Sequence, residues 1–345
     1  TQGSHAVFWT RAGSANSSTD EGELSMNNAS SITTNGGKII MAGSTDVDSD
    51  GLPNGHIYGN SNVTVSLGTG SAAAVSLNSG NGDIRIYSRA GSSAAHAAAL
   101  INNGTETVID AGTGRADIRL TSSSTADNVF ESWGPFTVRS TAGSSVTVPA
   151  VRFQAVQTNA SSTWTPIQQQ GTFVHRFLAL GGGNLAVSIT SARAASYAID
   201  VARNFDFLAS SGDITVDFGQ NGIDLQYATT TNQIEFGATG SSTSTSRVTI
   251  IGDRFPEVAA NSQVGAVVAK TSGTVSIVPS STSFSSAASA DTTFDSTWAF
   301  TGTTGLTIGK SGNTGPITMA AAPSIAGNLS LSLIHISEPT RQAEI

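Results

Sequence analysis

Short stretches of alternating apolar and polar residues recur along the whole chain, and most of them follow a glycine. Alternation over a few residues is the period of a β-strand that buries one of its two faces. The preceding glycine supplies the turn into the strand. The recurring phrase begins at Gly37, Gly82, Gly212, Gly273 and Gly305. Many short strands separated by Gly, Asn and Ser turns predict an all-β protein that is built by repetition and contains little helix.

The strength of this repeat and the content of aromatic residues divide the chain into segments. Residues 1–127 carry strand repeats with an acidic loop at 46–54, and residues 261–330 show the same texture again. Residues 128–260 are richer in aromatic side chains and match the repeat less well. Stacked coils of this kind need only their neighbours for stability, so the pattern predicts an extended scaffold and not a closed globule.

One short sequence is repeated with its charged residues at the same positions. Asp83-Ile84-Arg85-Ile86 is followed 34 positions later by Asp117-Ile118-Arg119-Leu120. An interval of this length fits one large coil or two small ones. If Arg85 and Arg119 lie one coil apart, each needs Asp83 or Asp117 beside it, because like charges stacked directly on one another are unfavourable.

The last residues, 331–345, are interpreted as foreign to the protein. The run LSLIHISEPTR at 331–341 resembles a translated sequencing adapter, and 342–345 follow it directly. Segments of this kind are excluded from fold reasoning. The chain also begins at Thr1 and not at a methionine. We therefore expect it to be an internal piece of a longer protein with a non-native, adapter-derived tail.

Composition narrows the function classes. The 345 residues carry a formal net charge of −8, and charged residues make up only 12%, about half the usual share. An acidic chain without basic clusters argues against nucleic acid or an anionic membrane as a partner. No apolar run approaches the roughly 20 residues of a membrane helix, so we expect no membrane insertion by this segment. The chain has no cysteine, which excludes disulfides, thiolate metal sites and cysteine nucleophiles.

Several stretches resemble the repeats of filamentous-haemagglutinin-type exoproteins, which are large β-strand-repeat adhesins of Gram-negative bacteria exported by a two-partner or autotransporter route. They are SITTNGGKII at 31–40, SGNGDIRI at 79–86, GLTIGKSGNTGPITM at 305–319 and PSIAGNL at 323–329. The resemblance implies a right-handed parallel β-helix, a solenoid, on the bacterial cell surface. It further implies a role in cell adhesion or biofilm formation, with glycans or proteins of host or neighbouring cells as partners. The aromatic-rich segment at 128–260 leaves room for a β-sandwich-like insertion.

Two other classes stay open beside the adhesin. One is a viral tail-fibre-like appendage protein, which trimeric interdigitation would support. The other is a β-helical polysaccharide lyase or hydrolase, which would need Asp, Arg and Lys to converge on one face; no such groove is visible in the sequence. The carboxylates such an enzyme could use are Asp206, Asp213, Asp217 and Asp224. Exposed strand or turn aspartates are the simpler interpretation, and no residue is assigned as catalytic.

The acidic loop is the sharpest candidate for a metal site. Asp46, Asp48 and Asp50 stand at alternate positions and are followed by a glycine, a pattern that converges oxygens on a hard cation such as calcium. An EF-hand would need Glu at the twelfth position, where Ile57 stands. The loop is more similar to the Asp-x-Asp-x-Asp-Gly loops of thrombospondin-type or dockerin-like repeats. The predicted calcium ligands are Asp46, Asp48, Asp50 and Asn54, with a solvated acidic turn as the alternative.

Overall fold

The regular structure of this protein is entirely β-strand in the part of the chain described. The computed structural model describes residues 3–332 apart from the following positions: 11–22, 27, 60–63, 69–73, 92–98, 103–104, 126, 145–147, 170–172, 194–197, 201–203, 222, 225–232, 239–242, 256–266 and 286–291. No helix occurs in these residues, as the alternating pattern predicts. Accordingly, none of them forms a helix that is long and apolar enough to cross a membrane.

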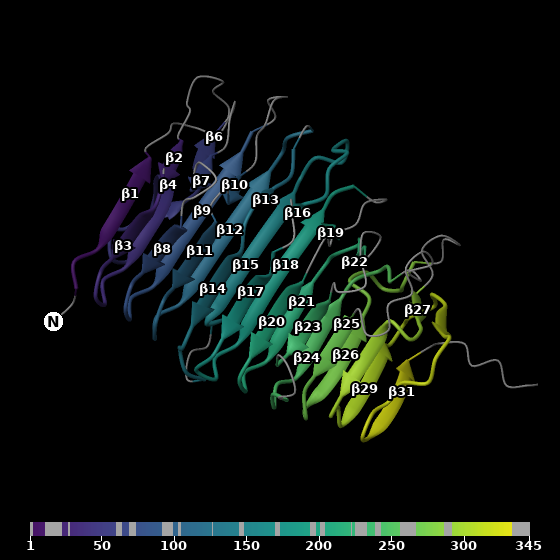
Figure 1. Ribbon diagram of the computed structural model, residues 1–345. Helices are drawn as coiled ribbons and strands as arrows, with labels where there is room; N and C mark the ends of the chain where they lie inside the picture. The colour runs from purple at the N-terminus through teal and green to yellow at the C-terminus, as the bar shows by residue number, and fades with distance from the viewer. Residues whose placement is uncertain are drawn as a thin grey trace, which may run out of the picture.

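The strands belong to three large sheets and one small one (Figure 1). Sheet A holds β1 (Ala6–Thr10), β4 (Ile39–Val47), β5 (Pro53–Gly55), β6 (Ile57–Gly59), β9 (Ile84–Ala90), β12 (Ala116–Ser122), β15 (Val151–Gln157), β18 (Leu185–Ser191), β21 (Ile214–Asp217), β24 (Val248–Ile251), β26 (Thr274–Val278), β29 (Gly305–Gly309) and β31 (Asn328–Ser332). Sheet B holds β2 (Leu24–Met26), β7 (Val65–Leu67), β10 (Leu100–Asn102), β13 (Phe130–Ser132), β16 (Ile167–Gln169), β19 (Ile199–Asp200) and β22 (Ile223–Asp224). Sheet C holds β3 (Ser30–Thr33), β8 (Ala74–Asn78), β11 (Glu106–Asp110), β14 (Phe136–Ser140), β17 (His175–Ala179), β20 (Phe205–Ala209), β23 (Ile234–Gly237), β25 (Val267–Lys270) and β28 (Trp298–Thr301). The small sheet pairs β27 (Thr292–Phe294) with β30 (Ile317–Met319).

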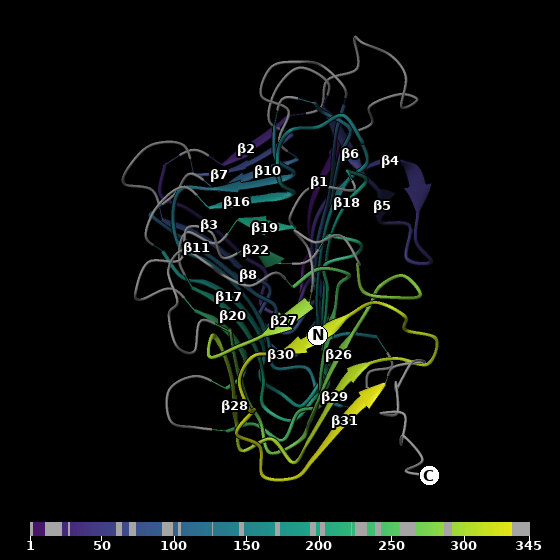
Figure 2. The same ribbon diagram turned by 90° about the vertical axis from the view of Figure 1, so that its right-hand side faces the viewer.

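The chain visits the three large sheets in turn. From β7 to β24 the order is sheet B, sheet C, sheet A, repeated without interruption, and each strand pairs with the strand of the next circuit in parallel. Among the described strands, the one antiparallel pair is the hairpin of β4 and β5. Figure 2 shows the sheets around a common interior, with this hairpin standing out to one side. The protein is thus all-β, with mostly parallel sheets.

A single apolar cluster fills the interior along the stack. Inward positions of sheet A form an unbroken column because register partners on neighbouring strands face the same way. The column runs through Met41, Ile86, Ile118, Phe153, Val187, Val216, Ile250, Ile277 and Ile308. Each of these side chains is buried. Each circuit therefore buries its apolar face against the circuits before and after it.

The aromatic-rich segment is part of this stack. The expectation of a β-sandwich-like insertion within 128–260 is wrong, because β13 to β24 continue the same three sheets in parallel pairing, and β22 is the last strand of sheet B. The buried aromatic residues of this segment come from all three sheets, with Phe130 in sheet B and Phe153 in sheet A, and in sheet C Phe177, Phe207 and Phe236 are register partners. Their rings stack with centroids 5.5 and 5.4 Å apart. The change of texture records larger core side chains and not a different fold.

The end of the described chain reaches into the stretch interpreted as a foreign tail. Leu331 and Ser332 form the end of β31, which pairs with β29. Residues 333–345 lie outside the described residues.

Candidate functional site

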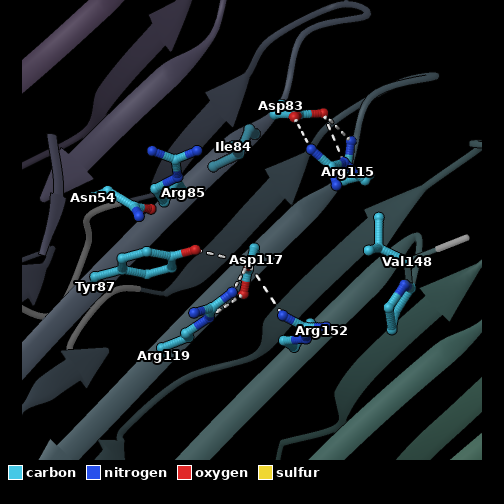
Figure 3. A pocket seen from close by; sticks show the side chains of 11 residues that line it. Asn54, Asp83, Ile84, Arg85, Tyr87, Arg115, Asp117, Arg119, Val148 and Arg152 are labelled. Carbon is cyan, nitrogen blue, oxygen red and sulfur yellow. Dashed lines mark hydrogen bonds and ion pairs between the residues drawn. The ribbon is translucent and has the colours of Figure 1, made fainter. Parts of the chain in front are cut away.

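Charged side chains gather in a groove on the outer face of sheet A (Figure 3). We call it the arginine groove. Its volume is about 190 Å³. It is lined by Asn54, Asp83, Ile84, Arg85, Tyr87, Arg115, Asp117, Arg119, Val148, Pro149 and Arg152. Four guanidinium groups and two carboxylates therefore meet on one face of a protein whose net charge is −8.

The strand period places these side chains outside. In β9, Ile84 and Ile86 point into the core, so Arg85 between them must point outward. The same alternation turns Asp117 and Arg119 of β12 outward, since Ile118 is buried. Three neighbouring strands, β9, β12 and β15, thereby contribute to one polar surface.

The pairing register sets opposite charges beside each other. Asp117 lies directly between Arg85 and Arg152 on the neighbouring strands. The repeated phrase would stack Asp on Asp and Arg on Arg if it were paired at its interval of 34, but the strands pair at 32, as between Asp83 and Arg115. A shift of two residues keeps the same side chains inside and exchanges repulsion for attraction outside. The expected need of Arg85 and Arg119 for a neighbouring aspartate is confirmed, with Asp117 in that place.

Tyr87 lies under two of the arginines. Its ring is 4.6 Å from the Arg119 guanidinium carbon and 5.6 Å from that of Arg85. Its hydroxyl donates a hydrogen bond of 2.8 Å to Asp117 Oδ2, and the residue is only 2% exposed. Burial, followed by the charge and hydrogen bond of Asp117, raises the pKa of Tyr87. The phenol therefore stays protonated and fixes both the carboxylate and the two cations above it.

A second ion pair anchors Arg115. Its Nη2 donates to Asp83 Oδ2 over 2.6 Å, and its backbone N–H donates to Oδ1 over 2.9 Å. Burial would raise the pKa of Asp83, but the hydrogen bonds and charge of Arg115 outweigh it and lower that pKa. Asp83 is therefore a carboxylate at neutral pH, and it holds the Arg115 guanidinium at the rim of the groove.

The acidic loop forms one wall of the groove. Residues 48–52 are the turn of the β4–β5 hairpin, where Asp48 Oδ1 accepts hydrogen bonds from the backbone of Asp50 and Leu52, both at 3.0 Å. Asp48 Oδ2 accepts one from Arg85 Nη1, also at 3.0 Å. Burial raises the pKa of Asp48, but the Leu52, Arg85 and Asp50 hydrogen bonds outweigh it, and the net shift is downward.

The predicted calcium ligands have separate partners in this structure. Asp48 is bound as just described, Asp50 forms an ion pair with Lys38 at 2.5 Å, and Asp46 is exposed. Asn54 is also exposed and lines the groove. Across the described residues, no group of three or more His, Asp or Glu is placed to share a metal ion. The loop thus supports a hairpin turn, and calcium binding stays a prediction that calorimetric titration with CaCl₂ tests.

The groove continues along the stack. A second hollow of about 360 Å³ shares Arg119 and Arg152 with it and extends over β15, β18 and β21. Its polar lining is Gln154, Ser188, Thr215 and Asp217. Burial raises the pKa of Asp217, a backbone hydrogen bond from Gly219 opposes this, and Asp253 adds to it. The two hollows together fall within the roughly 300–1,000 Å³ that ligand sites occupy.

The four aspartates considered for an enzyme do not come together. Asp206 lies in β20 of sheet C, whereas Asp217 lies in β21 of sheet A. Asp213 precedes β21 and forms an ion pair with Arg247. Asp224 ends β22, and its side chain is outside the described set.

Asp206 has a carboxylate neighbour that the sequence did not reveal. Glu235 is its register partner on β23. Burial first, and then the charge of Glu235, raise the pKa of Asp206 to about 6, while Arg176 and Lys270 act in the opposite direction. Arg176 Nε is 3.2 Å from Asp206, and Lys270 Nζ is 2.7 Å from Glu235. Each carboxylate thus has its own cation, and the four form a charge cluster on sheet C.

Comparisons with known proteins give no match: no family model, no curated protein and no solved structure matches this chain. The resemblance to filamentous-haemagglutinin-type exoproteins therefore rests on the repeated phrases alone and stays a prediction.

Sequence reasoning missed the groove because its residues are scattered over more than one circuit. Arg85, Arg119 and Arg152 are each isolated along the chain, and no basic run marks them. The usable signal was the position of an arginine between two inward apolar residues. Three such positions on neighbouring strands make a surface only once the register is known.

Proposed function

We propose that this chain is a segment of a parallel β-helix that serves as the scaffold of an extracellular, bacterial surface adhesin. The observation that carries the proposal is the order in which the chain visits sheets B, C and A, circuit after circuit, around one apolar column. A right-handed turn of each circuit is part of the proposal. Such a stack extends by adding circuits and needs no further closure.

An adhesive role follows from what the stack offers to its surroundings. Outward positions of sheet A from β9 to β21 are mostly polar, and the arginine groove hollows that face. Loops positioned by a rigid scaffold and long open faces suit binding to extended partners. The proposed partners are glycans or proteins on host or neighbouring cells.

An adhesion assay tests the proposal. Beads coated with the folded chain are compared with beads coated with the same chain after heat unfolding, for retention of bacterial and epithelial cells and of immobilised polysaccharides. We expect retention by the folded chain well above the control. Equal retention by both kinds of bead would refute the adhesive role. A trimer in light scattering would favour an appendage protein instead.

A polysaccharide-degrading enzyme is the second candidate, because Asp and Arg do converge in the arginine groove. Hydrolysis by paired carboxylates needs one of them protonated. Asp83 is held ionised by Arg115, and Asp117 accepts hydrogen bonds from Tyr87 and Arg119. This geometry favours binding over bond cleavage. Release of new reducing ends from a bound polysaccharide would reverse that order.

A further inference from the structure

We propose that the arginine groove binds a linear polysaccharide that carries carboxylate groups, with the sugar chain running along the stack across the strands of sheet A. This inference rests on the proposed function, since it names the ligand class of the adhesive face. It goes beyond it by assigning the site to Arg85, Arg115, Arg119 and Arg152.

Charge is the first argument. The lining of the groove holds four guanidinium groups and two carboxylates, and Asp48 of the adjoining hairpin pairs with Arg85, so four positive charges face three negative ones within an acidic chain. A guanidinium has five N–H donors in a planar fork that matches a carboxylate. The aspartates and the backbone carbonyl that these arginines contact within the protein use only some of their N–H donors. The carboxylate of an acidic sugar would accept hydrogen bonds from the remaining N–H groups.

Arg152 is the arginine with the most donors to offer. Its Nη1 lies 3.7 Å from Asp117 Oδ2, which is an ion-pair distance but too long for a hydrogen bond. Asp117 already accepts hydrogen bonds from Arg119 at 3.0 and 2.8 Å and from Tyr87 at 2.8 Å. The Arg152 side chain is 35% exposed. It stands where the two hollows join, so a ligand in either one reaches it.

The spacing of the strands matches an extended sugar chain. Arg85 and Arg152 are both register partners of Asp117, so they are separated by two strand-to-strand steps of about 4.8 Å each, whereas Arg119 lies two residues along the middle strand from Asp117. This step is comparable with the length of one hexose unit in an extended polymer. Beyond Arg152, the lining changes to Gln154, Ser188 and Thr215, whose uncharged polar groups suit sugar hydroxyls, and it ends at the carboxyl of Asp217, where a neutral sugar unit fits better than a charged one.

The arginines are held in place before any ligand arrives. Arg85 donates to Asp48 and to the Pro53 carbonyl, both at 3.0 Å, and Arg119 lies over the Tyr87 ring. Groups fixed in advance lose less conformational entropy on binding. Because their side chains are held in fixed positions, these arginines differ from isolated cations on the protein surface.

A carboxylated sugar chain fits the rest of the molecule better than nucleic acid. DNA carries one charge per roughly 1.7 Å of its axis. A polysaccharide whose charges are uronic-acid carboxylates has a single charge on each acidic sugar and is therefore less densely charged. The remaining surface is acidic and repels a dense polyanion. A sparsely charged chain can place its carboxylates in the groove and its neutral parts outside it.

Binding of an oligogalacturonate to the full chain, measured by titration calorimetry, tests the inference. The ligand control is the methyl ester of the same oligomer, which keeps the sugars and removes the charges. Arg152→Gln is the test variant. Arg139→Gln is the matched control, because Arg139 is also exposed and ion-paired, with Asp110 at 2.7 Å, but lies on sheet C. Circular dichroism and melting curves confirm that both variants fold.

We expect the acid to bind and its methyl ester to bind at least tenfold more weakly. Arg152→Gln should weaken binding of the acid about tenfold, as loss of one charge-assisted hydrogen bond predicts, and Arg139→Gln less than twofold. Equal affinity for acid and ester, equal losses in the two variants, or tighter binding of single-stranded DNA would overturn the inference. If the folded chain retains cells but binds no acidic oligomer, this inference fails and the adhesive role stands. If it retains neither, both fail.

Discussion

Replacement of His175 by phenylalanine should stabilise the protein, and by an amount that grows as the pH falls. His175 is fully buried in sheet C, between Phe136 and Phe205 on the neighbouring strands. Its ring contacts Phe205 edge-on with centroids 5.0 Å apart. Neither ring nitrogen has a hydrogen-bond partner. Burial lowers its pKa to about 4.

The sign of the pH effect follows from proton binding. In the unfolded chain His175 takes up a proton as the pH falls through about 6.5, whereas in the folded protein it stays neutral until about 4. Between these values the unfolded state binds more protons, so folding stability is lost as the pH falls. The loss amounts to about 3 kcal/mol at pH 4, from 1.36 kcal/mol per pKa unit.

At pH 7 a smaller gain is expected from the same substitution. An unpaired buried polar group costs roughly 1–3 kcal/mol, and a phenyl ring extends the column of Phe136 and Phe205 without that cost. The larger ring offsets part of this gain if the site is tight. His175→Phe is therefore expected to add about 1 kcal/mol at pH 7 and about 3 kcal/mol more near pH 4.

Urea unfolding at a series of pH values measures the difference in unfolding free energy between variant and wild type. Taking this difference cancels every other titrating group that the substitution leaves alone. Phe236→Leu is the control, because it changes a fully buried side chain of sheet C that does not titrate, and its difference should not grow on acidification. A difference for His175→Phe that is flat from pH 7 to pH 4 would refute the reasoning.

Three further predictions concern the same stack. Asp206→Asn should stabilise the protein at pH 7 but not at pH 4, because a carboxyl whose pKa is raised to about 6 costs stability once it ionises; urea unfolding at both pH values measures this. Gly112→Ala should lower the melting temperature by several degrees, because Gly112 has φ +55° and a Cβ there would collide with a backbone oxygen. Gly305→Ala is the control, since a Cβ at Gly305 meets ordinary contacts only, and it should change the melting temperature little. Calorimetry measures both melting temperatures, and equal shifts would contradict the geometry. Deletion of 185–213 removes one circuit and puts Ile214 in the place of its register partner Leu185, so the shortened protein should still unfold cooperatively. Deletion of 185–198 removes only part of a circuit, and that product should not unfold cooperatively. A cooperative transition in both proteins would argue against a stack of circuits.

The acidic loop is a turn, as one interpretation of its sequence predicted, but its position over sheet A was not predicted. The alternating aspartates predicted a loop, and the β4–β5 hairpin is that loop. Its Leu52 packs on Ile40, Ala42 and Tyr87, a small apolar cluster outside the main core. The hairpin thereby folds over sheet A and brings Asp48 to Arg85. The contact of Asp48 with Arg85 is not visible in the sequence, because the two residues are 37 positions apart.

The sequence by itself determined the strands and their two faces. Period-two alternation identified Ile84 and Ile86 as inward and Arg85 as outward, and it did so from a few neighbouring residues. The same local rule predicted an all-β chain with little helix, and the described residues form strands and no helix.

Only the tertiary structure decided which outward residues meet. A strand that slips by two residues keeps the same faces buried, so the alternating pattern cannot choose between a pairing offset of 32 and the 34 of the repeated phrase. Turn lengths also vary between circuits, with Ile39 pairing 45 positions on, with Ile84, and Ile84 pairing 32 positions on, with Ala116. The observed register packs the apolar side chains across circuits and forms ion pairs between strands, Arg115 with Asp83 and Arg152 with Asp117. That choice, made between residues far apart in the chain, created the arginine groove.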